Sequence, residues 1–499
     1  MSLRKQAIEG VAWNSIGQIG NTILQFILSI ILMRLLKPDD YGILAMAMVC
    51  IGFVGILNEF GVSTAIVQNR DIQQSELSSI FWFMILNGMF FTVLIYVGSS
   101  WIAHFFHTDQ LKDVLRWLSL NFLIGSIGVI PAGLLQQQMK FKMINIINII
   151  SVILSGIAGI YLAYMGKGVM SLVAQTLCAL IITVLLRFIF CNWYPLAIFK
   201  FSHLKKVFSF SFFLTGYSVV DYWSRRADDL LVGKFLGSTA LGIYSRGYYL
   251  MLRPIAQIYS IIGSVVTASF SAIQHDKKKI RESYVHILQI TSLFIFPALI
   301  GLSAVSDNLV IAVFGDKWKE AIPIIRILSL SGIPVSLSVC TSWIYISQNK
   351  TGLMFYWGLF NSVMIILSVL IGLWYGSLIA IAIAYTIANV LLLYPAVLIS
   401  GRLISLNFKD FILKITPELS ISLFMGAMVY LIGKILPQGL TDLQKSVIQV
   451  LSGIIIFSTC VYVFQLHAFK LIKSVLTDVG ISKTIGRLVG SRYFSFLYD

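Results

Sequence analysis

The stretch LSSIFWFMILNGMFFTVLIYVGSSW, residues 77–101, contains no Asp, Glu, Lys or Arg. A helix needs ~20 mostly apolar residues to cross the hydrocarbon core of a membrane, so this stretch predicts a membrane-spanning helix. Similar apolar runs recur along the chain, each separated from the next by a short polar segment. The composition agrees, because 58% of the 499 residues are hydrophobic and only 12% are charged, about half the charged share of an ordinary globular domain.

These runs predict an all-α polytopic membrane protein with about fourteen transmembrane helices. The predicted helices are 12–36, 42–66, 77–101, 113–137, 143–165, 169–193, 208–235, 239–272, 284–314, 319–347, 353–375, 377–401, 411–433 and 445–468. The first helix is too long for a signal-peptide core and no cleavage site follows it, so we expect it to be retained.

Matching residues at two places indicate an internal repeat. Arg34-Leu35-Leu36, followed by Gly42, aligns with Lys234-Phe235-Leu236, followed by Gly242, at an offset of 200. Later matches, among them Gln138 with Gln348 and Gly166 with Gly376, have an offset of 210. Chance matching of apolar helices is the alternative explanation. A six-helix unit crosses the membrane an even number of times, so its two copies would be related by a pseudo-two-fold axis along the membrane normal.

The repeat predicts a division of the chain into two bundles, two extra helices and a tail. The predicted parts are an N-terminal six-helix bundle at 1–200, a C-terminal six-helix bundle at 201–402, two additional transmembrane helices at 403–470 and a basic cytoplasmic tail at 471–499.

The net charge of +16 predicts a topology rather than a nucleic-acid partner. If the N-terminus is cytoplasmic and the number of crossings is even, most of the 37 Lys and Arg residues fall on the cytoplasmic side, as the positive-inside rule requires. We therefore expect both termini in the cytoplasm and the basic excess against anionic lipid of the inner leaflet.

The chain also lacks the sequence signatures of catalysis. It contains no phosphate-binding loop and no G-x-S-x-G or H-E-x-x-H motif. Its five cysteines lie in or beside apolar runs and form no C-x-x-C pair, which is typical of buried free thiols. We expect no enzyme activity, no catalytic residues, no cofactor and no metal.

Polar side chains share one face in several predicted helices. The charged stripes are Asp221, Arg225 and Asp228 in the seventh helix and Arg246, Tyr249 and Arg253 in the eighth, and the first helix carries the uncharged stripe Asn14, Gln18, Asn21 and Gln25. Their spacings of three, four and seven residues place each set on one helix face. Charges inside a membrane are costly and usually functional, so a central hydrated cavity is the simplest target of these stripes.

A tight turn at Gly237-Ser238 would make the seventh and eighth helices antiparallel. The ion pairs expected at equal depth are Asp221 with Arg253 and Asp228 with Arg246. Arg225 would then face Tyr249 and stay largely free. The alternative is that these pairs only lock the two helices together, but locking leaves the excess of cations unexplained.

The four arginines of these two helices would cost about 10–14 kcal/mol at the membrane centre, before pairing and hydration reduce the cost. Three acids cannot neutralise four arginines, and the remaining positive charge suits an anionic cargo, because Arg matches phosphate geometry. The candidate substrate-binding residues are Arg225, Arg226, Arg246, Arg253, Tyr249, Asn21 and Gln25. The candidate ion-coupling residues, which would bind a proton or sodium ion, are Glu59, Asp221, Asp228 and Asp229.

Three segments of the chain resemble bacterial polysaccharide exporters. The segments are EFGVSTAIVQ at 59–68, LSSIFW at 77–82, and ADDLLVGKFLG at 227–237 followed by LGIY at 241–244. They are similar to the Wzx-like flippases of the colanic-acid and teichuronic-acid exporter branch, within the multidrug/oligosaccharidyl-lipid/polysaccharide exporter superfamily. The resemblance covers roughly residues 1–480.

This resemblance implies two six-helix bundles with two trailing helices in the bacterial cytoplasmic (inner) membrane, and alternating access. It implies an undecaprenyl-diphosphate-linked oligosaccharide as substrate, moved from the inner to the outer leaflet for exopolysaccharide or O-antigen biosynthesis. Arginines of a central cavity hold the pyrophosphate in related lipid flippases, which implies that role for Arg225, Arg226, Arg246 and Arg253. The first helix offers amides where some relatives have cations.

Other functions remain open at this point. A cation-coupled multidrug exporter of the same fold should present an acidic cavity, whereas this one is net basic. A polysaccharide polymerase or ligase would need a sizeable outer loop, and a structural scaffold is a further alternative. We expect a monomer surrounded by membrane lipid, with no nucleic-acid partner and with contacts to a polymerase or other polysaccharide-pathway proteins. The sugars and the coupling ion are left open.

Overall fold

The computed structural model describes residues 3–69, 71–201 and 204–471, and in these residues all the regular elements are helices. The helices are α1 (Leu3–Leu35), α2 (Pro38–Glu59), α3 (Val62–Gln68), α4 (Gln74–Phe105), α5 (Gln110–Leu118), α6 (Leu120–Gln137), α7 (Phe141–Tyr164), α8 (Val169–Cys191), α9 (Leu204–Ala272), α10 (Lys277–Phe314), the 3-10 helix η2 (Asp316–Trp318), α11 (Ala321–Ser347), α12 (Thr351–Trp374), α13 (Leu378–Leu403), α14 (Phe408–Ile435) and α15 (Asp442–Val463). The predicted basic tail lies outside the described residues, apart from residue 471.

Twelve helical segments of the described chain are long and apolar enough to cross a membrane, which confirms the predicted fold class. Each of them matches one predicted helix. The predicted helix 42–66 is divided between α2 and α3, and 113–137 is divided between α5 and α6. The two remaining predicted helices, 208–235 and 239–272, both fall within α9.

The break inside α9 lies at Gly237, where φ is 84° and ψ is −178°. Glycine adopts a positive φ at little cost because it has no Cβ. The structure therefore confirms the predicted interruption between the seventh and eighth helices, and it reduces the connection to a single non-helical residue.

The glycines matched by the repeat take part in a reciprocal close contact. A Cβ on Gly42 would lie 1.7 Å from the backbone oxygen of Ser238, and a Cβ on Gly242 would lie 1.9 Å from the backbone oxygen of Pro38. Pro38 and Ser238 are themselves 200 residues apart. Each glycine therefore contacts the repeat counterpart of the residue that the other glycine contacts. A local two-fold relation produces this reciprocal pattern, so the two contacts support a repeat at the offset of 200.

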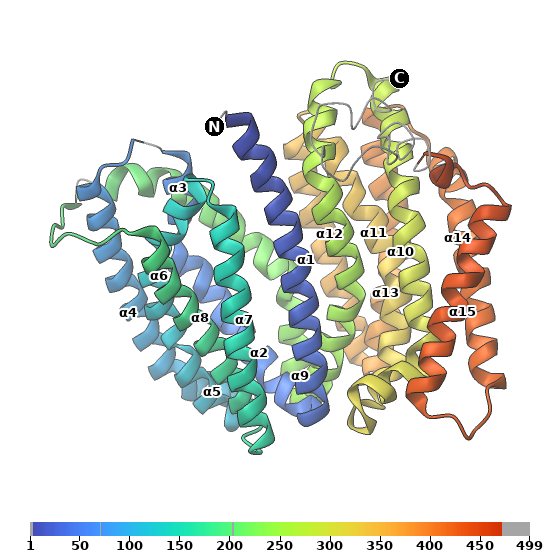
Figure 1. Cartoon of the computed structure of the whole chain (residues 1–499), viewed down its shortest axis with the longest axis horizontal. Coiled ribbons are helices and arrows are strands. Elements are labelled where there is room, and N and C mark those ends of the chain that lie inside the picture. The colour runs from blue at the N-terminus through green and yellow to red at the C-terminus, as the bar shows by residue number, and fades with distance from the viewer. Residues whose placement is uncertain (1–2, 70, 202–203, 472–499) are drawn as a thin grey trace. The chain divides into compact units, whose positions relative to one another are not determined.

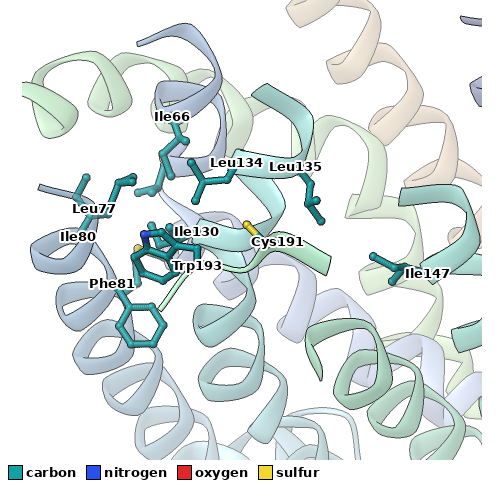
Figure 2. Close-up of a cluster of buried hydrophobic side chains, with 12 residues drawn as sticks. Ile66, Leu77, Ile80, Phe81, Ile130, Leu134, Leu135, Ile147, Cys191 and Trp193 are labelled. Atoms are coloured by element: carbon teal, nitrogen blue, oxygen red, sulfur yellow. The ribbon is translucent and has the colours of Figure 1, made fainter. Parts of the chain in front are cut away.

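The chain separates into two compact units, Met1–Gly242 and Ile243–Asp499. The core of the first unit gathers around Ile66, Phe81, Ile130, Leu134 and Trp193, which come from α3, α4, α6 and the segment after α8 (Figure 2). Trp193 is anchored by a hydrogen bond from its indole Nε1 to Gln74 Oε1, at 2.6 Å. The compact units divide after Gly242, whereas the predicted bundles divide after residue 200. The predicted division was derived from the repeat and not from compactness, and it stays a prediction.

In the second unit, α10 packs against α11, α14 and α15, and these helices run side by side in Figure 1. Polar contacts fasten them at both ends. Asn308 on α10 donates to Gln449 Oε1 on α15 at 2.8 Å, and Gln449 donates to the carbonyl of Val429 on α14 at 3.1 Å. At the other end, Gln289 on α10 donates to the carbonyl of Lys414 on α14 at 3.0 Å.

Candidate functional site

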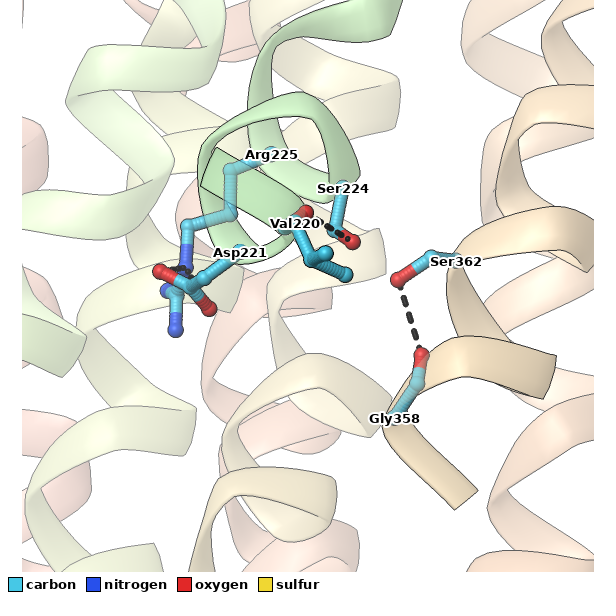
Figure 3. Close-up of polar contacts among 6 residues, drawn as sticks. All are labelled: Val220, Asp221, Ser224, Arg225, Gly358 and Ser362. Carbon is cyan, nitrogen blue, oxygen red and sulfur yellow. Dashed lines mark hydrogen bonds and ion pairs between the residues drawn. The ribbon is translucent and has the colours of Figure 1, made fainter. Parts of the chain in front are cut away.

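Arg225 and Asp221 form an ion pair along one face of α9. The guanidinium Nε of Arg225 lies 3.0 Å from both carboxylate oxygens of Asp221 (Figure 3). The expectation that Arg225 stays largely free is therefore wrong. The reason is local: the i, i+4 spacing that puts both side chains on one face also puts them within reach of each other.

The pair is open on its outer side. The Arg225 side chain is 75% exposed and that of Asp221 is 39% exposed. Only Nε is used, and Nη1 and Nη2 of Arg225 donate no hydrogen bond within the part of the chain that the structure describes. The arrangement can therefore offer the four N–H donors of Nη1 and Nη2, on a guanidinium held in place, to an acceptor such as a phosphate.

A second pair lies one turn further along α9. Nη1 of Arg226 lies 2.7 Å from Oδ2 of Asp229. Asp229 is buried, and its backbone N–H donates to Oδ1 of Asp228 at 2.9 Å. Asp228 is also buried. Two adjacent carboxylates thus lie in the interior, and Arg226 is bound to one of them.

The residues predicted on the eighth helix lie together in the second unit. The Tyr249 ring centroid is 5.4 Å from the guanidinium carbon of Arg246 and 4.3 Å from that of Arg253. Arg253 also donates to the Tyr249 hydroxyl. The predicted common face is confirmed, and an aromatic ring between two cations holds both by cation–π attraction.

The two predicted ion pairs, Asp221 with Arg253 and Asp228 with Arg246, would each join a residue of one unit to a residue of the other, and they stay predictions.

On α1, Asn21 is half-buried and its Oδ1 is buried without a hydrogen-bond partner in the described chain. Gln25 is likewise half-buried.

Glu59 lies where α2 ends and the chain breaks. Phe60 and Gly61 have positive φ values of 46° and 66°, and α3 begins directly afterwards. Asn58, which is buried, donates to the carbonyl of Phe122 at 3.3 Å and to the Ser126 hydroxyl at 3.2 Å. The break is thus held by a polar contact to α6, as irregular backbone within a membrane requires.

Two further charged residues inside apolar helices form no part of the predicted site, one in each unit. Arg187 lies in the last turns of α8, where Glu59 acts on it electrostatically. Glu418 is a buried acid inside α14. The signal for Glu418 was available, since it is a carboxylic acid within an apolar run, but it belongs to no stripe of polar residues.

The second unit also contains an apolar cavity of about 540 Å³. It is lined by α10, α14 and α15 through residues that include Leu293, Pro297, Met425, Ile454 and Phe457. A lining of this kind accommodates a hydrocarbon chain and has little to offer a sugar.

Membrane-length helices, a helix break held by side chains and charged clusters inside α9 define a polytopic membrane protein of the transporter type. Residues 31–323, more than half of the chain, match the sequence pattern of a family described as polysaccharide biosynthesis protein. The chain belongs to that family.

Comparison with individual proteins agrees with this assignment. The chain is 29% identical to the teichuronic acid biosynthesis protein TuaB of Bacillus subtilis (strain 168), over 86% of this chain and 89% of that protein. It is 24% identical to the lipopolysaccharide biosynthesis protein WzxC of Escherichia coli (strain K12), over 87% and 89%. The fold is similar to that of lipid II flippase MurJ in its inward closed conformation, with a TM-score of 0.72 and 19% identity over 90% of this chain and 98% of that one.

Proposed function

We propose that this protein is a flippase that moves an undecaprenyl-diphosphate-linked oligosaccharide repeat unit from the cytoplasmic to the outer leaflet of the bacterial inner membrane. The observation that carries the proposal is the fold similarity to a lipid II flippase over 98% of that chain. The names of the two relatives, which concern teichuronic acid and lipopolysaccharide, support a surface polysaccharide as the end product.

The described residues fit the two ends of such a cargo. The pyrophosphate needs positively charged donors, and Arg225 presents an exposed guanidinium edge. Within the second unit, the Arg246–Tyr249–Arg253 cluster offers two cations and an aromatic ring. The polyprenyl chain needs apolar surface, which the cavity along α10, α14 and α15 supplies. Alternating access, an ion as driving force, cytoplasmic termini and contacts to a polymerase belong to the same proposal.

The test is a deletion of the gene in its native host. Lipid-linked repeat units should accumulate, and a membrane-impermeant reagent that oxidises and labels sugars should reach them only after the cells are permeabilised. Restoring the intact gene should return the labelled fraction in unpermeabilised cells. If the units stay accessible from outside in the deletion strain, another protein moves them and the proposal fails.

A further inference from the structure

Glu418 lies in the interior of α14 and forms no ion pair with any residue that the structure describes. Only 1% of its surface is exposed, and its Oε2 accepts no hydrogen bond from the described residues. α14 is long enough to cross the membrane, and Glu418 lies about ten residues, or about 15 Å, from its first residue, Phe408. The carboxyl is therefore well inside the span. A buried carboxylate without a partner is strongly disfavoured, and such a group takes up a proton instead.

The packing register brings a second unsatisfied polar group to the same level. Gln289 on α10 donates to the carbonyl of Lys414, and Ile300 packs against Gly426. These two contacts fix α10 against α14 on both sides of Glu418 and place Ser292 level with it. Ser292 is 2% exposed, and its hydroxyl also lacks a hydrogen-bond partner in the described chain. A protonated carboxyl can donate to a hydroxyl oxygen or a bridging water, whereas a carboxylate can only accept.

The charged side chains and histidines of the neighbouring helices lie toward the ends of this contact. Toward the first turns of α10 and α14 they are Lys277, Lys278, Lys279, Arg281, Glu282 and His286 of α10, Lys409, Asp410 and Lys414 of α14, Arg402 in the last turn of α13, and His467 and Lys470 beyond α15. Toward the other end they are Asp307 of α10, Arg326 of α11, Lys434 of α14, and Asp442 and Lys445 of α15. Between them, Cys460 of α15 lies in an apolar cluster with Leu293 and Ile421. His467 stacks on His286 with ring centroids 5.3 Å apart, and its Nδ1 lies 3.2 Å from Gln289 Oε1.

A histidine pair therefore lies at the Gln289 end of the same polar contact. In the described residues, Glu418 does not join other acids, histidines or cysteines in a group that could hold a metal ion.

We propose that Glu418 is a proton-binding site of the transport cycle. Its carboxyl carries a proton while α14 packs against α10, and it releases the proton when that contact opens. The link to transport rests on the proposed flippase function, whereas the binding of a proton does not. Glu418 thereby joins Glu59, Asp221, Asp228 and Asp229 as a candidate for coupling, and it differs from them in lying outside both six-helix sets of the predicted repeat.

Infrared spectroscopy of the full chain in lipid nanodiscs tests proton binding directly. At neutral pH the spectrum should contain a carboxylic-acid C=O band that Glu418→Gln removes. The matched control is Glu320→Gln, which alters an exposed acid at the start of α11 and should leave the band in place. If Glu418→Gln leaves the band unchanged, or if sodium chloride removes it at constant pH where potassium chloride does not, the site does not hold a proton as proposed.

A transport measurement in proteoliposomes tests coupling separately. If one proton moves per cargo molecule, a gradient of one pH unit supports a cargo ratio across the membrane of up to about tenfold. The intact chain should reach such a ratio, while Glu418→Gln should bring it close to one and Glu320→Gln should not. Because Gln resembles the protonated acid, Glu418→Gln should fold, and Glu418→Asp, which still titrates, should keep part of the response.

The outcomes separate the two proposals. A Glu418→Gln protein that responds fully to the pH gradient overturns the coupling role even if the infrared band is lost. If the intact chain moves no lipid-linked oligosaccharide under any gradient, the flippase proposal fails, while the infrared result still decides whether Glu418 binds a proton.

Discussion

The charged face of α9 could be predicted from single residues, but its partners could not. The spacing of Asp221, Arg225 and Asp228 fixes a common face, because helical geometry is local. The choice between a partner four residues away and one on another helix depends on packing that the spacing does not encode. The structure shows the local pair, with Nε of Arg225 held at 3.0 Å from Asp221.

Arg225→Ala should leave folding nearly intact and strongly reduce export. An exposed i, i+4 ion pair stabilises a helix by only ~0.3–0.5 kcal/mol, so the free energy of unfolding should change little. Arg225→Lys should keep part of the export, because the charge survives while the bidentate geometry is lost. Membrane abundance and surface polysaccharide measured in the same cells separate the two effects.

Asp221→Asn is the matched control for Arg225→Ala. It breaks the same ion pair but keeps the guanidinium, so export should fall less than in Arg225→Ala, and the loss that remains measures the coupling role for which Asp221 is a candidate. Equal loss of export in Asp221→Asn and Arg225→Ala would mean that the pair, and not the arginine, is what export needs.

Arg246→Ala should lower the abundance of the protein in the membrane. If Arg246 is paired with Asp228, which is buried, its removal leaves an uncompensated charge at a cost of ~3–5 kcal/mol. Adding Asp228→Asn should then restore abundance. Quantitative immunoblotting of membranes checks this, and a double variant no more abundant than Arg246→Ala would show that the two residues are not a pair.

At the scale of elements, the apolar runs were sufficient to predict the membrane helices but not their interruptions. Phe60 and Gly61 both have positive φ values where α2 ends. A single Gly within an apolar run does not predict such a break. The interruption at Gly237 was predictable because the polar residues Lys234 and Ser238 surround it. Glu418 was missed because an isolated acid forms no pattern.

Gly42→Ala and Gly242→Ala should each destabilise the protein by a similar amount. In both variants the new Cβ would meet a backbone oxygen at less than 2 Å, and backbone cannot move aside as a flexible side chain can. Gly55→Ala, also in α2, is the control, because a Cβ there meets nothing within 4 Å, and it should be neutral or stabilising by up to ~1 kcal/mol. Thermal unfolding in detergent measures all three, and unaltered melting of Gly42→Ala would contradict the reciprocal contact.

At the scale of the whole molecule, composition and charge distribution determined the class of protein, and the comparisons determined the family. The substrate role of individual arginines was not accessible from the sequence, because it depends on how residues far apart in the chain surround a common space. The repeat gave the best long-range information, since the two glycines that it aligns, Gly42 and Gly242, make reciprocal close contacts.

The topology prediction can be checked by labelling single cysteines in a background without natural cysteines. Lys140 and Lys350 follow helices predicted to end in the cytoplasm, whereas Lys167 and Tyr375 follow helices predicted to end outside. An impermeant thiol reagent added to intact cells should label Lys167→Cys and Tyr375→Cys only. Labelling of Lys140→Cys or Lys350→Cys from outside would reverse or reject the predicted orientation.

The most direct test of the proposed function is flipping by the purified full chain in proteoliposomes that contain undecaprenyl-diphosphate-linked oligosaccharide. The fraction of the oligosaccharide that an external glycosidase can cleave is followed over time. With the intact chain, cleavage should proceed rapidly beyond the outer-leaflet share toward completion. With Arg225→Ala it should remain close to that share, as in protein-free vesicles. If the intact chain gives the same protected fraction as protein-free vesicles, with an imposed pH gradient as well as without one, the protein is not a flippase for this class of lipid.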